Sequence, residues 1–330
     1  MTRVAVLKGG GSLERQVSLR SGARVQDALE RLGHEVLAID VGAELVDDLN
    51  AAAPEVVFVA LHGRDGEDGT VQELLEVLGI PYTGSGVSAC IRAADKVLAK
   101  HAMRDHGLPT PDFYAFNETA FETLGAGRAL PAIEERLAFP IVVKPARQGS
   151  ALGIKFARNT ADVPAALVSA FSYDRKVLLE RYVAGRELAV SVLDDDGEPI
   201  ALPIVEAVPE QENFYDFESR YEIGRTRFQC PAELEPAVTA RAQEVALAVY
   251  RLLGCRGFAR VDLMLEGAAG DLFVLEVNPI PGLTETSLLP QAAEAAGISF
   301  DSLIERILAA VPRATRRRRN PPGSPGQESP

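Results

Sequence analysis

Cysteine is scarce in this sequence, and membrane-length apolar runs are missing. Its 330 residues include three cysteines, Cys90, Cys230 and Cys255, which are far apart and form no CxxC pair. Their odd number and wide spacing indicate neither a disulfide framework nor a zinc site. No apolar run approaches the roughly 18 to 20 residues of a membrane span, and the opening residues, MTRVAVLKGGG, are typical of a strand rather than a signal peptide. We therefore expect a cytoplasmic protein without a membrane partner.

An excess of positive charge is missing as well. The net charge is −13 and the isoelectric point is about 4.9, so the charge balance does not indicate a nucleic-acid partner. Residues 313–330 are the exception, because four consecutive arginines precede a Pro/Gly/Ser-rich end that is typical of disorder. We interpret this segment as a disordered, solubilising tail, and contact with nucleic acid is the alternative.

Strand-like and helix-like segments alternate over residues 1–98. RVAVLK, HEVLAIDV and EVVFVAL are typical of strands, and the helical segments after the first and the third of them end at glycine. Such alternation predicts an α/β domain with βαβ units and a parallel sheet, which binds ligands at the carboxyl ends of its strands. Two chemically unusual segments, KGGGSLER and LHGRDGEDGT, fall at these ends.

The rest of the chain predicts two α+β units. A helix expected over 87–106 leads into the Pro-rich passage GLPTPDFYAF, which favours a domain boundary. We expect a small central unit over 99–184 and a C-terminal unit with an antiparallel sheet over 185–312. Residues 210–230 are polar and aromatic without periodicity, and a loop of this length is often a functional lid.

A β-hairpin is predicted where GFARVDLMLE and LFVLEVNP flank the loop GAAGD. Because residues two apart on a strand share a face, one face is apolar and is expected in the core. Its residues are Val261, Leu263, Leu265, Phe273, Leu275 and Val277. The other face carries Arg260, Asp262, Glu276 and Asn278. With a five-residue loop, Asp262 would lie opposite Glu276, and Arg260 opposite Asn278.

We refer to this polar strand face as the metal face, because it favours a metal site. Two facing carboxylates repel each other unless a cation lies between them, and oxygen ligands on rigid strands suit Mg²⁺, particularly when phosphates complete its coordination. A solvated strand face is the alternative, although Asp and Asn are poor strand formers.

A second glycine-bearing segment, VVKPARQGSALG, could contact phosphates. A strand ends at Lys144, and the loop after it carries Ser150 between two glycines. Backbone N–H groups in such a loop can cradle phosphate, and Lys144 would add a positive charge. The GxxxxGK[ST] pattern is missing, and a tight hairpin turn is the alternative.

The segments after the first and third strands hold further candidates. Gly9, Gly10 and Gly11 are contiguous, so GxGxxG is missing. Ser12 could cap the following helix, and Glu14 in its first turn could either complement the helix dipole or hold an ammonium group. His62 follows a buried strand at its carboxyl end, a position that favours a site residue over a structural one.

Taken together, these segments resemble the ATP-grasp superfamily and, within it, the D-alanine–D-alanine ligases. The resemblance runs from Val4 to Val311. Its motifs, in the order of the family, are GGGSLERQVSLRSG, ALHGRDGEDGTVQ, PYTGSG followed by DK, VVKPARQGSALG, FYDFESRY, GFARVDLML and LEVNPIPGLTETSLLP.

The resemblance implies that ATP binds between the central and C-terminal units. Expected ATP contacts are Lys96 and Lys144 at the phosphates, Glu180, Arg181 and Val183 at the adenine, Glu187 at the ribose, and Arg220 in the lid. Two Mg²⁺ (or Mn²⁺) ions would be held by Asp262, Glu276 and Asn278, with Glu276 bridging them. A homodimer is also implied.

The implied reaction joins two D-alanine molecules through an acyl phosphate, for peptidoglycan precursor synthesis. Glu14 would hold the first ammonium group close to His62, and Ser287 would hold the second carboxylate. The remaining catalytic contacts are Arg260 and the N–H of Gly282 at the oxyanion, and a lid residue, Tyr221, that hydrogen-bonds with Ser150 and Glu14.

Three positions depart from the family pattern. Arg220 replaces a usual lysine, Ala151 replaces a frequent serine, and Pro279 follows Asn278 where threonine is usual. Because Pro279 has no N–H and restricts the preceding residue, we keep as an alternative a related ligase acting on another amino-acid or dipeptide pair. An NAD-dependent oxidoreductase would require the missing GxGxxG, and the intact metal-face residues argue against a non-catalytic nucleotide-binding regulator.

Overall fold

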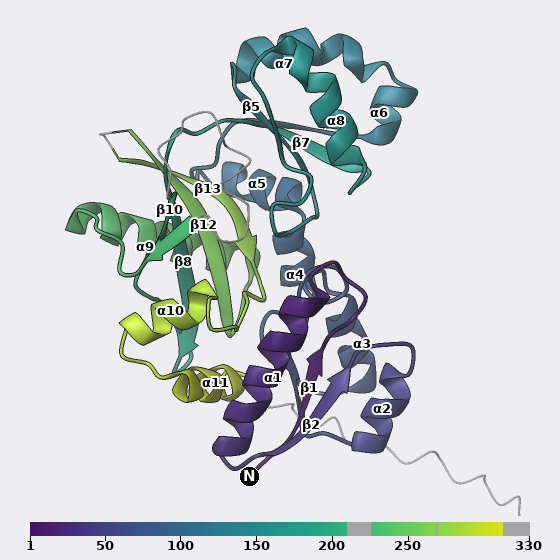
Figure 1. The fold of residues 1–330 in the computed structure, drawn as a ribbon, viewed down its shortest axis with the longest axis vertical. Coiled ribbons are helices and arrows are strands. Elements are labelled where there is room, and N and C mark those ends of the chain that lie inside the picture. The colour runs from purple at the N-terminus through teal and green to yellow at the C-terminus, as the bar shows by residue number, and fades with distance from the viewer. Residues whose placement is uncertain (210–225, 268–269, 313–330) are drawn as a thin grey trace, which may run out of the picture.

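Three β-sheets organise the described part of the chain, and each has its own set of helices (Figure 1). The computed structural model describes residues 1–209, 226–267 and 270–312. Each sheet falls within one of the three units expected from the sequence, although the boundaries between the units remain a prediction. Across the described ranges, no helix combines the length and the apolar character needed to cross a membrane.

The N-terminal sheet is parallel, as the alternating pattern predicted. Its strands run in the order β2-β1-β3. The elements are β1 (Arg3–Lys8), α1 (Arg15–Arg31), β2 (Glu35–Asp40), α2 (Leu45–Ala52), β3 (Val56–Val59) and α3 (Thr70–Leu78). All four residues of β3 are buried, so the chain leaves a packed strand directly before His62. The segments after β1 and β3 therefore meet at one edge of the sheet.

The single helix expected over 87–106 is wrong, because the chain forms α4 (Val87–Ala94) and α5 (Lys96–Asp105). Asp95 between them has an extended backbone, and its side chain accepts hydrogen bonds from the N–H groups of Val97 and Leu98. An aspartate in this geometry is a strong N-cap and starts a new helix. Lys96 consequently occupies the first turn of α5.

The central sheet is antiparallel, with strand order β4-β7-β5-β6. Its helices lie together on one side of the sheet and enclose a separate hydrophobic core (Figure 1). The strands are β4 (Phe113–Asn117), β5 (Ile141–Pro145), β6 (Lys155–Ala157) and β7 (Lys176–Arg181). The helices are α6 (Glu118–Glu122), α7 (Leu130–Leu137) and α8 (Val163–Phe171), with short 3-10 turns at Ala126–Ala129 and Thr160–Asp162.

The C-terminal sheet is also antiparallel, in the order β11-β10-β8-β12-β13, with β9 paired to β8. Its elements are β8 (Gly185–Asp195), β9 (Glu198–Ala201), β10 (Val205–Pro209), β11 (Thr226–Gln229), α9 (Pro236–Leu253), β12 (Phe258–Glu266), β13 (Asp271–Asn278), α10 (Leu288–Ala295) and α11 (Phe300–Ala309). Helix α9 packs on one face of this sheet, and α11 lies beside α1 (Figure 1). The first and last units therefore share one hydrophobic core.

The β12–β13 hairpin has the predicted register at its polar end. Arg260 pairs with Asn278, and Asp262 pairs with Glu276. The prediction for the apolar face is confirmed for Val277, which is buried in the core. It is wrong for Phe273 and Leu275, because a bulge beside Asp262 shifts the register and leaves Leu275 as the extra residue. Buried Val274 therefore packs in the core in place of Phe273 and Leu275.

Candidate functional site

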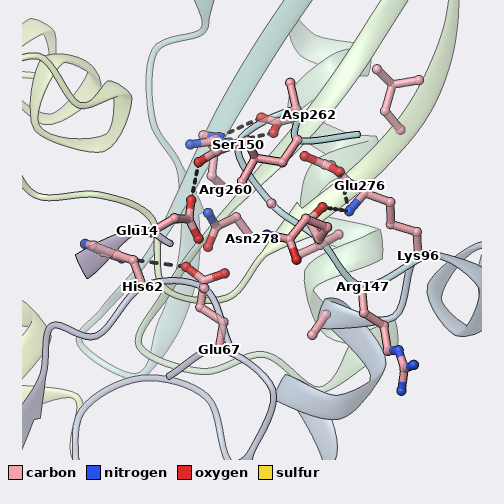
Figure 2. Close-up of a pocket in the computed structure, with 18 of the residues that line it drawn as sticks. Glu14, His62, Glu67, Lys96, Arg147, Ser150, Arg260, Asp262, Glu276 and Asn278 are labelled. Atoms are coloured by element: carbon pink, nitrogen blue, oxygen red, sulfur yellow. Dashed lines mark hydrogen bonds and ion pairs between the residues drawn. The ribbon is translucent and has the colours of Figure 1, made fainter. Parts of the chain in front are cut away.

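One large cavity brings most of the predicted site residues together (Figure 2). Its volume is about 1490 Å³, which exceeds the roughly 300 to 1000 Å³ of a pocket for one drug-sized ligand. Predicted site residues from all three units line it: Glu14, His62, Lys96, Lys144, Ser150, Glu187, Arg260, Asp262, Glu276, Asn278, Gly282 and Ser287. The cavity has room for a nucleotide and two small substrates at once.

The metal-face carboxylates already have protein cations beside them. Arg260 binds Asp262 through two hydrogen bonds of 2.7 Å each. The Nζ atom of Lys96 lies 3.1 Å from Oε2 of Glu276. Burial alone would raise the pKa of Glu276, but Lys96 and Lys144 outweigh this effect and lower the pKa to about 2. Glu276 is therefore an anion at neutral pH.

The donor set of this face fits Mg²⁺ when it is combined with phosphate. Asp262, Glu276 and Asn278 offer carboxylate and amide oxygens from two paired strands, and such oxygens are the ligands that Mg²⁺ prefers. Nowhere in the described ranges do three or more His, Cys, Asp or Glu side chains gather into a metal cluster. The protein alone therefore supplies an incomplete shell, which phosphate and water oxygens would have to complete.

The two lysines expected at the phosphates reach the cavity from different elements. Lys96 on α5 donates a hydrogen bond of 2.8 Å to the backbone carbonyl of Gln148, in the loop after β5. Lys144 on β5 donates to the carboxylate of Glu180 at 2.6 Å. A third lysine, Lys100, forms an ion pair with the same carboxylate. Lys100 was not predicted from the sequence, although its position one helical turn after Lys96 was a usable signal.

The residues expected at the adenine lie apart from the cavity wall. Glu180 and Val183 are buried, and neither they nor Arg181 line the cavity. The guanidinium of Arg181 forms a 2.8 Å ion pair with Glu266 and lies over the ring of Phe273. Arg181 therefore links β7 to the β12–β13 hairpin.

A half-buried acid, Glu14, occupies the corner expected for the first substrate. The Ser150 hydroxyl donates a hydrogen bond to Oε1 of Glu14, whereas Oε2 is buried and has no hydrogen-bond partner in the part of the chain that the structure describes. Burial and then Glu67 raise the pKa of Glu14, and the hydrogen bond from Ser150 opposes them. An unpaired buried carboxylate oxygen beside a cavity is a suitable acceptor for an ammonium group.

His62 is held in place by three neighbours. Its Nδ1 lies 3.0 Å from the carbonyl of Ile280, and its Nε2 lies 2.9 Å from the hydroxyl of Ser21. Glu67 approaches Nδ1 to 3.6 Å. Glu67 was not singled out from the sequence, although it stands among the acids and glycines after β3. The ring joins the N-terminal unit to the loop after β13.

Ser12 does not cap α1 as expected. The helix begins at Arg15, so Glu14 occupies the N-cap position. The Ser12 hydroxyl instead donates to the carbonyl of His62 at 2.7 Å and accepts from the N–H of Glu14 at 3.1 Å. Ser12 thereby connects the loops after β1 and β3.

Gly282 and Ser287 lie in direct contact in the loop before α10. A Cβ atom on Gly282 would come within 2.6 Å of Oγ of Ser287, so no other residue fits without displacing that hydroxyl. The same Oγ accepts a 3.0 Å hydrogen bond from the N–H of Thr284. Arg24 on α1 donates hydrogen bonds to the carbonyls of Leu283 and Thr284.

Two predicted site residues, Arg220 and Tyr221, lie outside the described residues. The same is true of 210–225 within the expected lid and of the tail over 313–330.

Comparison with protein families gives two matches. The model described as D-ala D-ala ligase C-terminus matches residues 102–309, and the one described as D-ala D-ala ligase N-terminus matches residues 42–85. The first alone covers more than half of the chain and includes the metal face.

Individual relatives match over almost the whole chain. A D-alanine–D-alanine ligase of Syntrophotalea carbinolica is 48% identical over 307 residues, which are 93% of this chain and 95% of the relative. The crystal structure of the D-alanine–D-alanine ligase from Bacillus anthracis complexed with ATP aligns with a TM-score of 0.78 at 32% identity, covering 94% of this chain and 97% of that one. The VanG D-Ala:D-Ser ligase from Enterococcus faecalis aligns with a TM-score of 0.79 at 28% identity, covering 94% and 99%. The chain belongs to the D-alanine–D-alanine ligase family.

Proposed function

We propose that this protein is an ATP-dependent, ADP-forming ligase that joins two D-alanine molecules into D-alanyl-D-alanine for peptidoglycan precursor synthesis. The observation that carries the proposal is the shared cavity of Glu14 and Glu276. Among the described residues, one acid has an oxygen without a hydrogen-bond partner, which suits an ammonium group, and the other lies on the oxygen-rich strand face. Relatives that cover the chain almost completely bear the name of this activity.

In the first step, a carboxylate oxygen of the first D-alanine attacks the γ-phosphorus of ATP. An O–P bond forms, the bond from the γ-phosphorus to the bridging oxygen breaks, and ADP leaves. Lys96 and Lys144 line the cavity and would neutralise the phosphate charge that builds up. Glu14 would hold the ammonium group of this D-alanine, and His62 lies close to the same corner.

Asp262, Glu276 and Asn278 are the residues that would hold divalent cations. Two Mg²⁺ or Mn²⁺ ions bound here would withdraw negative charge from phosphate oxygens. Lys96 and Arg260, which neutralise the two carboxylates in this structure, would then become available to substrate oxygens. Arg260 would exchange a bidentate carboxylate partner for the carbonyl oxygen of the acyl phosphate.

In the second step, the neutral amine of the second D-alanine attacks the acyl carbon. The new C–N bond replaces the C–O bond to phosphate, and inorganic phosphate leaves with the proton that the amine loses. Arg260 and the N–H of Gly282 would stabilise the tetrahedral oxyanion, and Ser287 would hold the second carboxylate. Tyr221 and Arg220 belong to the proposed lid, whose closure would keep water from the acyl phosphate.

Another amino-acid or dipeptide pair, the alternative raised by Pro279, is not favoured, since the relatives at 40–48% identity are D-alanine–D-alanine ligases. The similar D-Ala:D-Ser ligase makes D-serine the competing second substrate that an experiment has to include. The Asn278 side chain accepts a 2.9 Å hydrogen bond from the N–H of Ile280, so the turn through Pro279 retains an ordered backbone.

Phosphate release tests the proposed function. The enzyme is incubated with Mg-ATP and with D-alanine, L-alanine or D-serine, singly and in pairs, and the products are identified by mass spectrometry. We expect D-alanine alone to support release and to yield the dipeptide. Release that depends on a different amino acid, or none with D-alanine, would contradict the proposal.

Two properties complete the proposal. The protein would work in the cytoplasm, where ATP is supplied, and fractionation of its source cells measures this. It would form the homodimer implied by its resemblance to the family, and sedimentation velocity distinguishes a dimer from a monomer.

A further inference from the structure

Three charged side chains are buried together behind the cavity wall. Glu180 on β7 lies between Lys144 on β5 and Lys100 on α5, and it forms an ion pair with each lysine. Lys144 lines the cavity, whereas Lys100 and Glu180 do not. Lys144 is therefore the member of this group that is placed to reach a ligand.

Lys100 is anchored more firmly than either partner. None of its side chain is exposed. Its Nζ donates a 2.7 Å hydrogen bond to the hydroxyl of Thr110 and lies 3.3 Å from the carbonyl of Val274, two residues before Glu276 on β13. Lys100 thus connects the carboxylate of Glu180 with the strand that carries the metal face.

The charges of this group explain why two lysines are present. If Lys144 turned to phosphate, Glu180 would lose a cation inside the protein, and an unpaired buried carboxylate is strongly destabilising. Lys100 removes this obstacle because it remains bound to Glu180. Burial lowers the pKa of Lys100 to about 8, against the raising effect of Glu180, so the ammonium form predominates at neutral pH.

We propose that Lys100 is a positioning residue for ATP, which holds Glu180 in place and thereby allows Lys144 to leave that carboxylate for the phosphates. The inference rests on the proposed function in one respect, namely that ATP is the nucleotide bound in this cavity. It adds a role for a residue that contacts neither the nucleotide nor the amino acids.

Binding of a non-hydrolysable ATP analogue, the imido analogue with Mg²⁺, tests the role by calorimetry and needs no ligase activity. The variants are Lys100→Met, Glu180→Gln and the double variant. Tyr250→Phe is the matched control, because its buried hydroxyl donates to Asp194 outside the cavity. Thermal denaturation first establishes which variants are folded.

We expect Lys100→Met to raise the Kd of the analogue by about 10-fold, the effect of losing one charge-assisted hydrogen bond. Tyr250→Phe should lower the melting temperature without changing the Kd. Because Lys100 acts through Glu180, adding Lys100→Met to Glu180→Gln should change the Kd by less than about two-fold. The comparison of Glu180→Gln with the double variant still tests the proposal if Lys100→Met alone does not fold.

The proposal would be overturned if folded Lys100→Met bound the analogue with the Kd of the unchanged protein. It would also be overturned if the affinity losses of Lys100→Met and Glu180→Gln simply added in the double variant. Failure of the proposed ligase reaction gives a different result, since the unchanged protein would then bind the analogue but form no dipeptide from D-alanine.

Discussion

Asp262 and Glu276 lie opposite each other across the β12–β13 hairpin, yet each carboxylate is neutralised by a different cation. Arg260, on the same strand, binds Asp262, and Lys96 reaches Glu276 from the first turn of α5. Each of the two facing carboxylates therefore has a protein cation of its own. Binding of Mg²⁺ would exchange these partners and release both cations toward the substrates.

Removing the charge of Glu276 should abolish most of the activity. Glu276→Gln keeps the size of the side chain but loses the proposed bridging carboxylate, so we expect kcat to fall on the order of 100-fold and the Mg²⁺ concentration for half-maximal activity to rise. Steady-state kinetics over a Mg²⁺ titration measures both. Asp271→Asn, at the exposed far end of the same strand, is the control. If Glu276→Gln and Asp271→Asn had the same kinetics, the assignment of Glu276 as a metal ligand would be wrong.

The environment of Glu14 predicts opposite shifts in two variants. Glu14 must be ionised to hold an ammonium group, so the KM for the first D-alanine should rise as the pH falls through its pKa. The Ser150 hydrogen bond lowers this pKa and Glu67 raises it. The rise in KM should therefore move to higher pH in Ser150→Ala and to lower pH in Glu67→Gln.

The pH dependence of KM, followed upward from the ordinary range of carboxyl pKa values, measures these shifts. Glu73→Gln, exposed on α3, should leave the profile unchanged. Movement of both variants in the same direction would contradict the role of Glu14.

The contact between Gly282 and Ser287 predicts a defect in the second half-reaction. The methyl group of Gly282→Ala would meet the Ser287 hydroxyl at 2.6 Å, so the loop has to shift away from the bound substrate. We expect the KM for the second D-alanine to rise about 10-fold, with a smaller change in the KM for ATP. Gly127→Ala is the matched control, because an added Cβ there meets nothing within 4 Å. An equal KM for the second D-alanine in the two alanine variants would contradict the role of this loop.

The Asp95 cap should affect both stability and nucleotide binding. Asp95→Ala removes two hydrogen bonds to the first turn of α5, which should lower the free energy of unfolding by about 1 kcal/mol and raise the KM for ATP, because Lys96 lies in that turn. Asn117→Ala removes the N-cap of α6, far from Lys96, and should cost stability alone. Chemical denaturation and ATP kinetics compare the two variants. A similar rise in the KM for ATP in Asp95→Ala and Asn117→Ala would show that the effect comes from lost stability and not from the position of Lys96.

The sequence pattern was sufficient for the polar end of the hairpin. Its residues alternate with a period of two from Arg260 to Asp262 and from Glu276 to Asn278, so their shared face could be predicted. The bulge at Leu275 could not be predicted, because residues 272–275 are all apolar and their pattern does not tell which of them face the core. The predicted five-residue loop is shorter by one residue in the structure, and the bulge restores the register at the site.

Residues that act through other residues were harder to identify. Lys100 carries no motif, and its role depends on Glu180, which is 80 positions away in the chain and reaches it through tertiary packing alone. The break at Asp95 was missed because the apolar periodicity of α4 and α5 is nearly continuous, whereas a single capping side chain interrupts the helix.

Isotope transfer from substrate to phosphate tests the central claim most directly. The enzyme is given Mg-ATP and D-alanine labelled with ¹⁸O in its carboxylate, and the products are analysed by mass spectrometry. An acyl phosphate intermediate predicts that ADP and D-alanyl-D-alanine form together and that label from the carboxylate appears in the inorganic phosphate. Label in AMP, or dipeptide formed without labelled phosphate, would contradict the mechanism proposed for this cavity.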